Sequence, residues 1–409
     1  MEASGERILV VGINYSPEAT GIAPYTTAMA DSLAEGGARV RAITGIPHYP
    51  QWRVTDRRYR SGRRWRERLG SVEITRVAHS VPARATLLGR MRMEAEFFIR
   101  ATREVRADDS NAIIAVTPSL SGAAAAFVGA RGRPVGVVVQ DMTGAGAGES
   151  GTTGRRLARL ISHGEHALMR RAAVVGVITP RFGDLLRQHG VAGRRIMDLS
   201  NFTHIDPVNM NRMKARQRLG WPQGGTLVVH TGNMGMKQGL ESVVEAARVA
   251  QEKGLDVTFV LVGDGNQRDD LELLGRNVRN LRFVDPVSAE EYPYVLAAAD
   301  VLLLNERPGV LQMSLPSKLT SYVSARRPVL AAVERSGITR AVLEEDSAAA
   351  LVEPGDAVAL LAHVERLMAD DQRRADLVEA AAAMGARRYG REAAARRYRD
   401  FARRLLDER

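Results

Sequence analysis

The residues from Gly232 to Gly239, Gly-Asn-Met-Gly-Met-Lys-Gln-Gly, join an apolar run to a stretch with helical spacing. A helix N-terminus carries about half a positive charge and unpaired N–H groups, and glycine lets an anion approach these groups closely. Lys237 adds a formal positive charge beside them. Lys318 begins another predicted helix, in Pro-Ser-Lys-Leu-Thr. Glycines and lysines in these places are typical of a site that binds a diphosphate.

Lysine is rare in this chain, which makes these two positions informative. The sequence contains 54 arginines and only 4 lysines. Two of the four lysines, Lys237 and Lys318, start predicted helices that follow strands of the same predicted sheet. Chance would produce this coincidence in some sequences, whereas selection for a compact ammonium group beside a diphosphate explains both positions.

The hydrophobic pattern predicts the elements that position these residues. Continuously apolar segments alternate with segments of helical spacing in both halves of the chain, which is typical of parallel sheets covered by helices on both faces. The predicted strands are Arg7–Ile13, Arg39–Thr44, Val72–Val77, Ala112–Val116, Val135–Val139 and Ala173–Ile178 in the first half, and Thr226–Thr231, Asp256–Gly263, Leu281–Val284, Val301–Asn305, Val329–Ala332 and Ala349–Val352 in the second.

The sequence therefore predicts an α/β fold with two doubly wound, Rossmann-like domains. The length of 409 residues suits two domains. The stretch from Ser200 to Trp221 has no apolar run, so we place the boundary there, with domains at residues 1–203 and 204–386 and an amphipathic helix at 387–409. Ligands of open parallel sheets bind outside the carboxyl ends of the strands, so we expect a nucleotide in a cleft between the domains.

The joint after the first predicted strand differs from the joint at Gly232. It runs from Gly12 to Tyr25 and lacks the Gly-x-Gly-x-x-Gly fingerprint, which counts against a dinucleotide-dependent oxidoreductase. Gly21 in this loop allows backbone N–H groups and the next helix N-terminus to reach an anion. A plain turn is the alternative interpretation of the loop.

Residue types that are missing exclude several kinds of chemistry. The chain has no cysteine, so disulfides, thiolate zinc sites and cysteine nucleophiles are excluded. The 8 histidines show no metal-ligand spacing, and we interpret His163 and His166 as a surface pair on a helix. There is no Asp-x-Asp pair either, so we predict no metal site. No apolar window is long enough to span a membrane, so we expect a soluble or peripheral cytoplasmic protein.

The net charge of +11 arises entirely in the first half of the chain. Residues 1–200 hold 29 basic and 18 acidic residues, whereas residues 201–409 hold 29 of each. Three explanations stay open for the arginine-rich segment Arg53–Gly70: a codon bias, a nucleic-acid-binding arm, or a surface that faces anionic lipid or an anionic acceptor. Bias alone does not explain a neutral second half, so we expect a membrane or acceptor surface and no nucleic acid. The four arginines assigned to this surface are Arg57, Arg58, Arg63 and Arg64.

Taken together, the motifs resemble family 4 of the glycosyltransferases, whose GT-B fold has two facing Rossmann-like domains. The resemblance covers most of the chain and is closest to the branch found in capsule, colanic-acid-type and O-antigen gene clusters, which has Gly-Asn-x-Gly and Pro-Ser-Lys-Leu. The segments that carry it are Thr20–Tyr25, Gly232–Gly239, Leu261–Glu272, Asn280–Leu304 and Pro316–Ala331.

The resemblance implies both an activity and an architecture. A sugar would move from a nucleoside-diphosphate sugar, with UDP or GDP, to a glycan, lipid-linked or small-molecule acceptor. The transfer would retain the anomeric configuration and need no metal and no cofactor. The resemblance also implies that the last helix, residues 387–409, returns to pack on the first domain, which would bind the acceptor.

Roles for individual residues follow from the resemblance, with several departures. Much of the family has Arg and Lys in the joint where this chain has Asn233 and Gln238. Of the two family glutamates near the donor, the second corresponds to Ser321, and Glu306 is the nearest candidate for the first. The implied donor-binding residues are Gly21, Gly232, Asn233, Lys237, Gln238, Ser317, Lys318 and Ser321, with nucleotide-binding loops at Gly263, Gly265, Val284 and Pro286.

A further departure lies in the first domain. Where many members have a His-Asp pair in contact with the transferred sugar, this chain has Gln140 and Asp141, which with Glu306 are the candidate catalytic residues. Asp141 either orients or deprotonates the acceptor hydroxyl, or caps the turn after its strand. Because of these departures, two alternatives to the transferase stay open: a binding or scaffold protein with a degenerate donor site, and a UDP-sugar 2-epimerase, for which no carboxylate cluster is evident.

Overall fold

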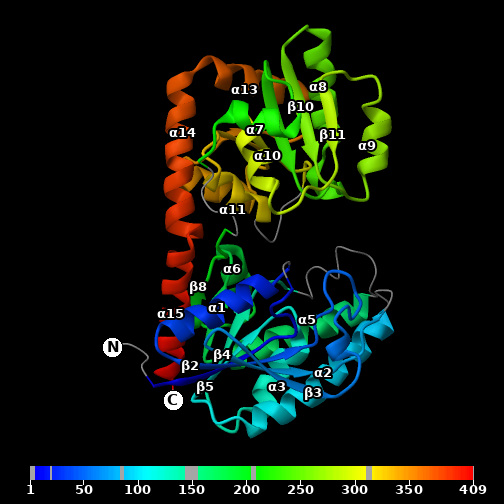
Figure 1. The fold of residues 1–409 in the computed structure, drawn as a ribbon. Coiled ribbons are helices and arrows are strands. Elements are labelled where there is room, and N and C mark those ends of the chain that lie inside the picture. Colours follow the sequence, from blue (N-terminus) through cyan, green and yellow to red (C-terminus); the bar gives the residue numbers. More distant parts are fainter. Residues whose placement is uncertain are drawn as a thin grey trace. The chain divides into compact units, whose positions relative to one another are not determined.

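The computed structural model describes residues 5–18, 21–82, 87–142, 155–203, 209–309 and 316–408. The chain divides into two compact units (Figure 1). The first unit consists of Met1–Asn201 together with Glu392–Arg409, and the second is Phe202–Arg391. Each unit is built around one sheet.

The first unit contains an eight-stranded sheet in the order β3-β4-β2-β1-β5-β6-β7-β8. All its neighbouring strands are parallel except β3 and β4, which pair antiparallel. The strands are β1 (Arg7–Val11), β2 (Arg39–Gly45), β3 (Arg64–Leu69), β4 (Val72–Val77), β5 (Ala112–Val116), β6 (Val135–Val139), β7 (Val174–Val177) and β8 (Ile196–Asp198). The helices are α1 (Ala23–Glu35), α2 (Leu87–Ala107), α3 (Leu120–Gly129), α5 (Arg155–Arg171), α6 (Pro180–Gln188) and α15 (Arg391–Leu406).

Two edge strands, β3 and β8, were not predicted. Four of the six residues of β3 are charged, so the strand lacks the apolar pattern that marks the others. It is stabilised instead by its ladder to β4 and by Glu67, which accepts hydrogen bonds from Arg76 at 2.8 Å and from the hydroxyl of Tyr59. A charged, exposed strand of this kind also protects the sheet edge against pairing with another chain.

The C-terminal helix α15 packs within the first unit, as the fold resemblance implies. A Cβ on Gly136 would lie 2.9 Å from the ring of Phe401, and one on Gly176 would lie 3.3 Å from the same ring. The glycines of β6 and β7 therefore form a hollow that this aromatic side chain fills. The helix starts at Arg391, later than the predicted residue 387, because a π-helical turn at Gly385–Tyr389 precedes it.

The prediction that His163 and His166 form a surface pair is wrong for one of them. His163 is exposed, but His166 is buried and its ring stacks on that of His189 with centroids 3.7 Å apart. Burial and the neighbouring positive groups lower the pKa of His166 to about 4. The two histidines are one helical turn apart on α5, with His163 at the exposed side and His166 in the packing.

The second unit contains a six-stranded parallel sheet in the order β11-β10-β9-β12-β13-β14. The strands are β9 (Thr226–Thr231), β10 (Val257–Val262), β11 (Leu281–Val284), β12 (Val301–Asn305), β13 (Val329–Ala332) and β14 (Ala350–Val352). The helices are α7 (Arg212–Leu219), α8 (Glu241–Glu252), α9 (Arg268–Leu274), α10 (Tyr292–Ala298), α11 (Ser317–Ser324), α12 (Ile338–Glu345), α13 (Ala357–Ala369) and α14 (Asp371–Met384).

Both faces of this second sheet are buried, which explains the continuously apolar strands. In β9, Leu227 and Val229 belong to the core on one face, while Val228 belongs to the core on the other. Helices α7, α10, α11 and α12 contribute to the first core, and α8, α9 and α13 contribute to the second. A helical layer on each face is the doubly wound arrangement that the alternation predicts.

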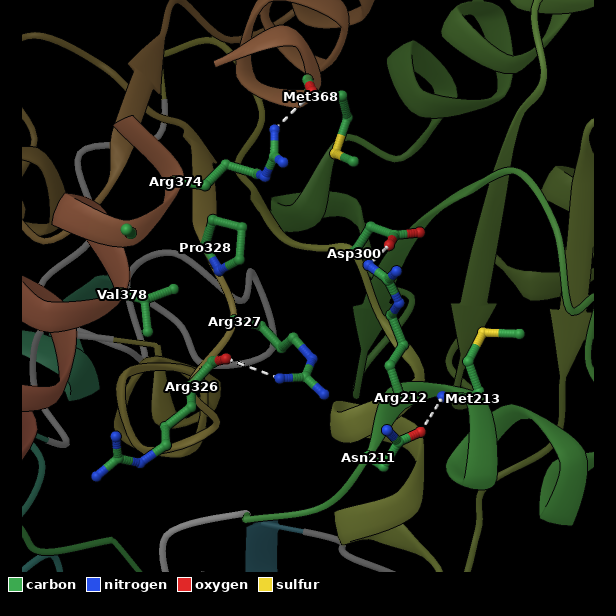
Figure 2. Close-up of a pocket in the computed structure, with 11 residues that line it drawn as sticks. Asn211, Arg212, Met213, Asp300, Arg326, Arg327, Pro328, Met368, Arg374 and Val378 are labelled. Atoms are coloured by element: carbon green, nitrogen blue, oxygen red, sulfur yellow. Dashed lines mark hydrogen bonds and ion pairs between the residues drawn. The ribbon is translucent and has the colours of Figure 1, made fainter. Parts of the chain in front are cut away.

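An arginine–aspartate network anchors α7 at the amino-terminal edge of this sheet. Asp300, which precedes β12, accepts hydrogen bonds from Arg212, from the fully buried Arg216 and from the backbone of Leu227. A pocket of about 400 Å³ lies beside this network (Figure 2). Its lining includes Arg212, Asp300 and Pro328, which precedes β13. This pocket is at the edge opposite to the loops that follow the carboxyl ends of the strands.

Candidate active site

Glycine-containing loops gather at the carboxyl ends of β9 and β10, which are neighbours in the sheet. Gly232 follows β9 with φ +101°, and Gly263 follows β10 with φ +141°. A Cβ on Gly263 would lie only 2.0 Å from the carbonyl oxygen of Gly232, and one on Gly265 would lie 2.5 Å from that of Met234. The two loops pack backbone against backbone, so a side chain at Gly263 or Gly265 would not fit.

The loop from Gly232 to Gly239 is held in shape by its own side chains. The Oε1 atom of Gln238 accepts a hydrogen bond from the backbone N–H of Gly235 at 3.1 Å and from Nδ2 of Asn233 at 3.4 Å. Residues Met236–Gln238 form a single 3₁₀ turn, and α8 begins only at Glu241. Lys237 lies within that turn with an exposed side chain. The structure thus brings together the predicted residues Asn233, Lys237 and Gln238 and gives two of them a role in loop shape.

Lys318 reaches the same loop from the first turn of α11. Its Nζ atom lies 2.8 Å from Nε2 of His230, a fully buried side chain on β9. The Cε atom of Lys318 lies 3.6 Å from where a Cβ on Gly232 would be. Burial lowers the pKa of Lys318 to about 7, although the nearby Glu306 opposes this shift. Lys318, which the sequence predicts to bind a diphosphate, thus lies beside the glycine loop, but its burial disfavours the charged form of the amine.

Glu306 follows β12, the other neighbour of β9, and is also buried. Its Oε1 atom accepts a hydrogen bond of 2.8 Å from the hydroxyl of Thr339 at the start of α12. Burial raises the pKa of Glu306 to about 7, while the hydrogen bond from Thr339 and the charge of Lys318 act in the opposite direction. The carboxyl group is therefore a candidate acid or base that exchanges its proton near neutral pH.

Ser317 and Ser321 lie on α11 beside Lys318 but differ in exposure. Ser317 is exposed at the first residue of the helix, whereas Ser321 is buried and hydrogen bonds to the hydroxyl of Tyr292. That hydroxyl is 2.9 Å from Oγ1 of Thr231, and the hydroxyl of Tyr322 accepts from the backbone N–H of Thr231 at 2.8 Å. This tyrosine cluster was not predicted, because Tyr292 and Tyr322 are 61 and 91 residues away from Thr231 in the sequence.

The remaining predicted nucleotide-binding residues lie at the ends of β10 and β11. The backbone N–H of Gly263 donates to the carbonyl of Val284 at 2.9 Å. Arg268, which sequence reasoning missed, donates to the carbonyl of Gly263 and pairs with Asp285, both at 2.8 Å. Pro286 is exposed next to Asp285. These residues form one continuous part of the edge that also carries Gly232.

Gln140, Asp141 and Gly21 belong to the first unit. Gln140 is buried, and its Oε1 atom accepts a hydrogen bond of 2.8 Å from the side-chain amide of Asn201. Asp141 is exposed, and its Oδ1 atom accepts a hydrogen bond from the backbone N–H of Met142 at 2.8 Å; the turn that it would cap lies outside the described residues. Gly21 has φ +67°, and a Cβ there would lie 3.1 Å from the ring of Tyr49.

A buried carboxylate that was not predicted shapes the loops around Gly21. Glu18 accepts hydrogen bonds of 2.8 Å from the backbone N–H groups of His48 and Tyr49 and from the side-chain amide of Asn14. It therefore ties the loop after β1 to the loop after β2. A glutamate in a loop carries no sequence signal of such a role, because its partners are mainly backbone groups 30 and 31 residues away.

The four arginines assigned to a membrane or acceptor surface are all exposed. They flank Tyr59 and β3 at one edge of the first unit. Two of them have acidic partners: Arg58 pairs with Asp56 at 2.7 Å and Arg64 pairs with Glu104 at 2.8 Å. The structure therefore places Arg57, Arg58, Arg63 and Arg64 on one surface, with part of its charge neutralised.

Two negative findings concern the described residues only. In the ranges that the structure describes, no group of three or more His, Asp or Glu side chains could hold a metal ion. Among the helices of that same part of the chain, none is both long and apolar enough to cross a membrane.

Two family models match the chain, one in each unit. The model described as glycosyl transferase 4-like domain matches residues 20–201, and the model described as glycosyl transferases group 1 matches residues 225–370. The chain belongs to family 4 of the glycosyltransferases. This glycosyltransferase is 29% identical over 381 residues to the putative colanic acid biosynthesis glycosyl transferase WcaI of Escherichia coli K12, with 88% of this chain and 92% of the relative covered.

Solved structures show that this glycosyltransferase has the GT-B fold. Sucrose-phosphate synthase from Thermosynechococcus elongatus superimposes with a TM-score of 0.71 at 17% identity, covering 98% of this chain and 99% of that one. Anabaena HepE in complex with UDP-glucose gives a TM-score of 0.66 at 17% identity, covering 97% and 99% of the two chains. At this level of identity the likeness concerns the fold alone.

Proposed function

We propose that this glycosyltransferase moves a hexosyl or deoxyhexosyl group from UDP- or GDP-sugar to a glycan, lipid-linked or small-molecule acceptor, with retention and without a metal ion. The second unit binds the donor, and the first unit, with α15, binds the acceptor. The observation that carries the proposal is the position of Lys318, whose ammonium group lies beside the glycine loop at Gly232, at the carboxyl edge of the sheet.

This edge suits a leaving group that becomes more negative as the glycosidic bond breaks. Lys318 and Lys237 supply ammonium groups, and Gly232 and Gly263 keep side chains away from this part of the edge. Such fixed donors stabilise developing charge without reorganisation during the reaction. We assign no protein nucleophile, and Asp141 has the role of orienting or deprotonating the acceptor hydroxyl.

Two comparisons support the choice of substrates. HepE was crystallised with UDP-glucose, so a nucleotide-sugar donor is compatible with this fold. The relative WcaI is named for colanic acid biosynthesis, which favours a polysaccharide or its lipid-linked precursor as the acceptor. Together with the exposed arginines at β3, this favours a cytoplasmic enzyme that associates peripherally with the inner face of the plasma membrane, with no nucleic-acid partner.

The alternative of a binding or scaffold protein rests on one specific observation. Asn233 and Gln238, at the places of the family Arg and Lys, bond to each other and to the loop instead of offering positive charge. A protein of this kind would bind a nucleoside diphosphate but turn over no donor. A 2-epimerase would interconvert donor sugars in the absence of any acceptor.

A thermal-shift screen of UDP-, GDP- and ADP-linked sugars, followed by product analysis, tests the proposal. We expect one UDP- or GDP-sugar to raise the melting temperature and to be consumed when a lipid-linked acceptor is supplied, with an α-linked donor giving an α-linked product by NMR. Binding without turnover would favour the scaffold, epimerised donor would favour the epimerase, and no shift with any donor would overturn the assignment of the site.

A further inference from the structure

His230 is the fully buried histidine on β9 that contacts Lys318. We propose that it is a positioning residue for the donor diphosphate, because it holds one N–H of the Lys318 ammonium group and leaves the other two directed to phosphate oxygens. This inference rests on the proposed nucleoside-diphosphate donor and adds a residue to its site.

The hydrogen-bonding partners of the ring determine which nitrogen accepts. Nδ1 of His230 lies 3.1 Å from the carbonyl oxygen of Leu303, on the neighbouring strand β12. A carbonyl oxygen can only accept, so the ring proton is assigned to Nδ1 and the neutral ring has its acceptor at Nε2. Nε2 is the atom 2.8 Å from Nζ of Lys318. With Nδ1 bonded to β12, the imidazole presents Nε2 to the lysine, and the backbone of Asn233 is a further hydrogen-bonding neighbour of the ring.

The position of His230 in the chain directs the lysine toward the loop. His230 is two residues before Gly232, and the stem of Lys318 passes 3.6 Å from where a Cβ on Gly232 would be. An ammonium group has three N–H donors. Nε2 takes one of them, and among the described residues no other hydrogen bond of this ammonium group is found, so we assign the other two to an anion that binds over the glycine loop.

Burial makes this arrangement sensitive to an anion. Two buried cations at 2.8 Å would repel each other, and burial together with the charge of Lys318 lowers the pKa of His230, which stays neutral. Burial also lowers the pKa of Lys318 to about 7. The other titratable group that acts on Lys318 is Glu306. Burial raises the pKa of Glu306 to about 7. A diphosphate next to these groups favours their protonated forms, so its binding takes up protons near neutral pH.

The experiment uses the full chain with UDP and GDP as probes and the nucleosides uridine and guanosine as controls. The variant His230→Leu removes the acceptor, whereas His230→Gln keeps a side-chain oxygen that accepts from Lys318. We expect His230→Leu to weaken diphosphate binding at least about fivefold at pH 7.5, because a hydrogen bond to the charged form of Lys318 is lost. We expect His230→Gln to restore most of the affinity, and nucleoside binding to stay unchanged in both variants.

Proton uptake gives a readout that a purely structural role of His230 would not affect. Calorimetry at pH 7.5 in buffers of different ionisation enthalpy should show wild-type protein taking up about half a proton or more per diphosphate. The difference in diphosphate affinity between wild type and His230→Leu should become smaller below pH 6, where Lys318 is increasingly protonated in both proteins. Selective ¹⁵N-lysine NMR, in which Lys318 is one of only 4 lysines, should show its ammonium titrating near 7 and higher once a diphosphate is bound.

The outcomes separate this inference from the proposed function. If wild type binds UDP or GDP but His230→Leu binds it equally tightly with the same pH profile, His230 is not a positioning residue and the donor assignment survives. If Lys318 titrates near 10 in the free protein, the inference also fails. If wild type binds neither UDP nor GDP, both the inference and the proposed donor fail.

Discussion

The side-chain amide of Asn305 donates hydrogen bonds to the carbonyl oxygens of Gln238 and Gly239, at 2.7 Å and 3.0 Å. Asn305 ends β12, so this buried side chain fixes the far end of the glycine loop to the neighbouring strand. The loop is thus held at both ends by groups from β12, since the Leu303 carbonyl holds His230 before it.

Asn305→Leu should therefore loosen the loop without changing its sequence. Two buried carbonyl groups would lose their donor, which costs about 1–3 kcal/mol of stability, and UDP or GDP affinity should fall. The matched control is Asn280→Leu, because Asn280 bridges the carbonyls of Leu255 and Val257 in the same way at the opposite edge. Chemical denaturation and calorimetry measure both effects. Equal loss of nucleotide binding in the two variants would mean that general stability, and not the loop, is responsible.

Lys318→Met should weaken nucleoside-diphosphate binding by about 1.5–3 kcal/mol, the size of a hydrogen bond to a charged group. Methionine keeps the apolar stem that packs beside Gly232, so the fold is preserved. Lys253→Met is the control, since Lys253 is exposed at the end of α8. Isothermal calorimetry with UDP and GDP measures these affinities. If Lys318→Met binds both as tightly as wild type, Lys318 is not part of the donor site.

The buried carboxyl group of Glu306 should make stability depend on pH. Burial raises the pKa of Glu306 from its usual 4.5 to about 7, so folding favours the protonated form. The cost of burying ionised Glu306 lowers the free energy of unfolding. This cost is absent below pH 4.5, grows between pH 4.5 and pH 7, and is complete above pH 7. Glu306→Gln, which still accepts from Thr339, should thus be more stable than wild type at pH 8 by about 1–3 kcal/mol and equally stable at low pH. Urea unfolding at both pH values tests this, and a pH-independent difference would contradict it.

Transfer should continue in the presence of excess EDTA, because protein groups neutralise the diphosphate in the proposed mechanism. The measurement is sugar transfer, or slow donor hydrolysis, before and after chelation. Recovery of a lost activity on addition of Mg²⁺ or Mn²⁺ would require a different account of the leaving group.

The arginine surface should bind anionic vesicles but not zwitterionic vesicles. Added salt should reverse the binding, because it screens the electrostatic attraction. A variant in which four arginines are changed together to Ser should no longer co-sediment with anionic vesicles but should still bind UDP and GDP. The four are Arg57, Arg58, Arg63 and Arg64. A control with the same loss of charge changes four exposed arginines of the second unit, Arg276, Arg279, Arg282 and Arg373. If the control loses as much binding, or if RNA displaces the vesicles from the first surface, the membrane-facing acceptor model is wrong.

The sequence predicted β5, β6, β9, β12 and β13 well because these central strands are buried and mainly apolar, and it also predicted β4 and β11, although each contains an exposed charged residue. The bounds of β4, β5, β6, β9, β11, β12 and β13 are the predicted ones. It failed at β3, where charged residues are tolerated on an edge strand whose stability comes from pairing with β4. The hydrophobic periodicity of a sequence reflects which residues are buried. None of the residues of β3 is buried, so the strand has no such periodicity.

The candidate site was predictable in part for a related reason. Glycines and a rare lysine mark the loop at Gly232 and the start of α11 in the sequence itself. The contact between Lys318 and His230 was not predictable, because 88 residues separate them and only the sheet brings them together. Burial of His230 and Glu306, which sets their proton affinities, is likewise a property of the folded unit and not of any local motif.

Helix α15 has a consequence for the order in which the protein is made. Phe401 fills the hollow over Gly136 and Gly176, so the first unit lacks part of its interior until residues near the end of the chain are available. During synthesis the whole of the second unit leaves the ribosome before those residues do. The first unit, although translated first, is therefore the last to be completed, and the nascent chain must keep its unfilled hollow away from other apolar surfaces in the meantime.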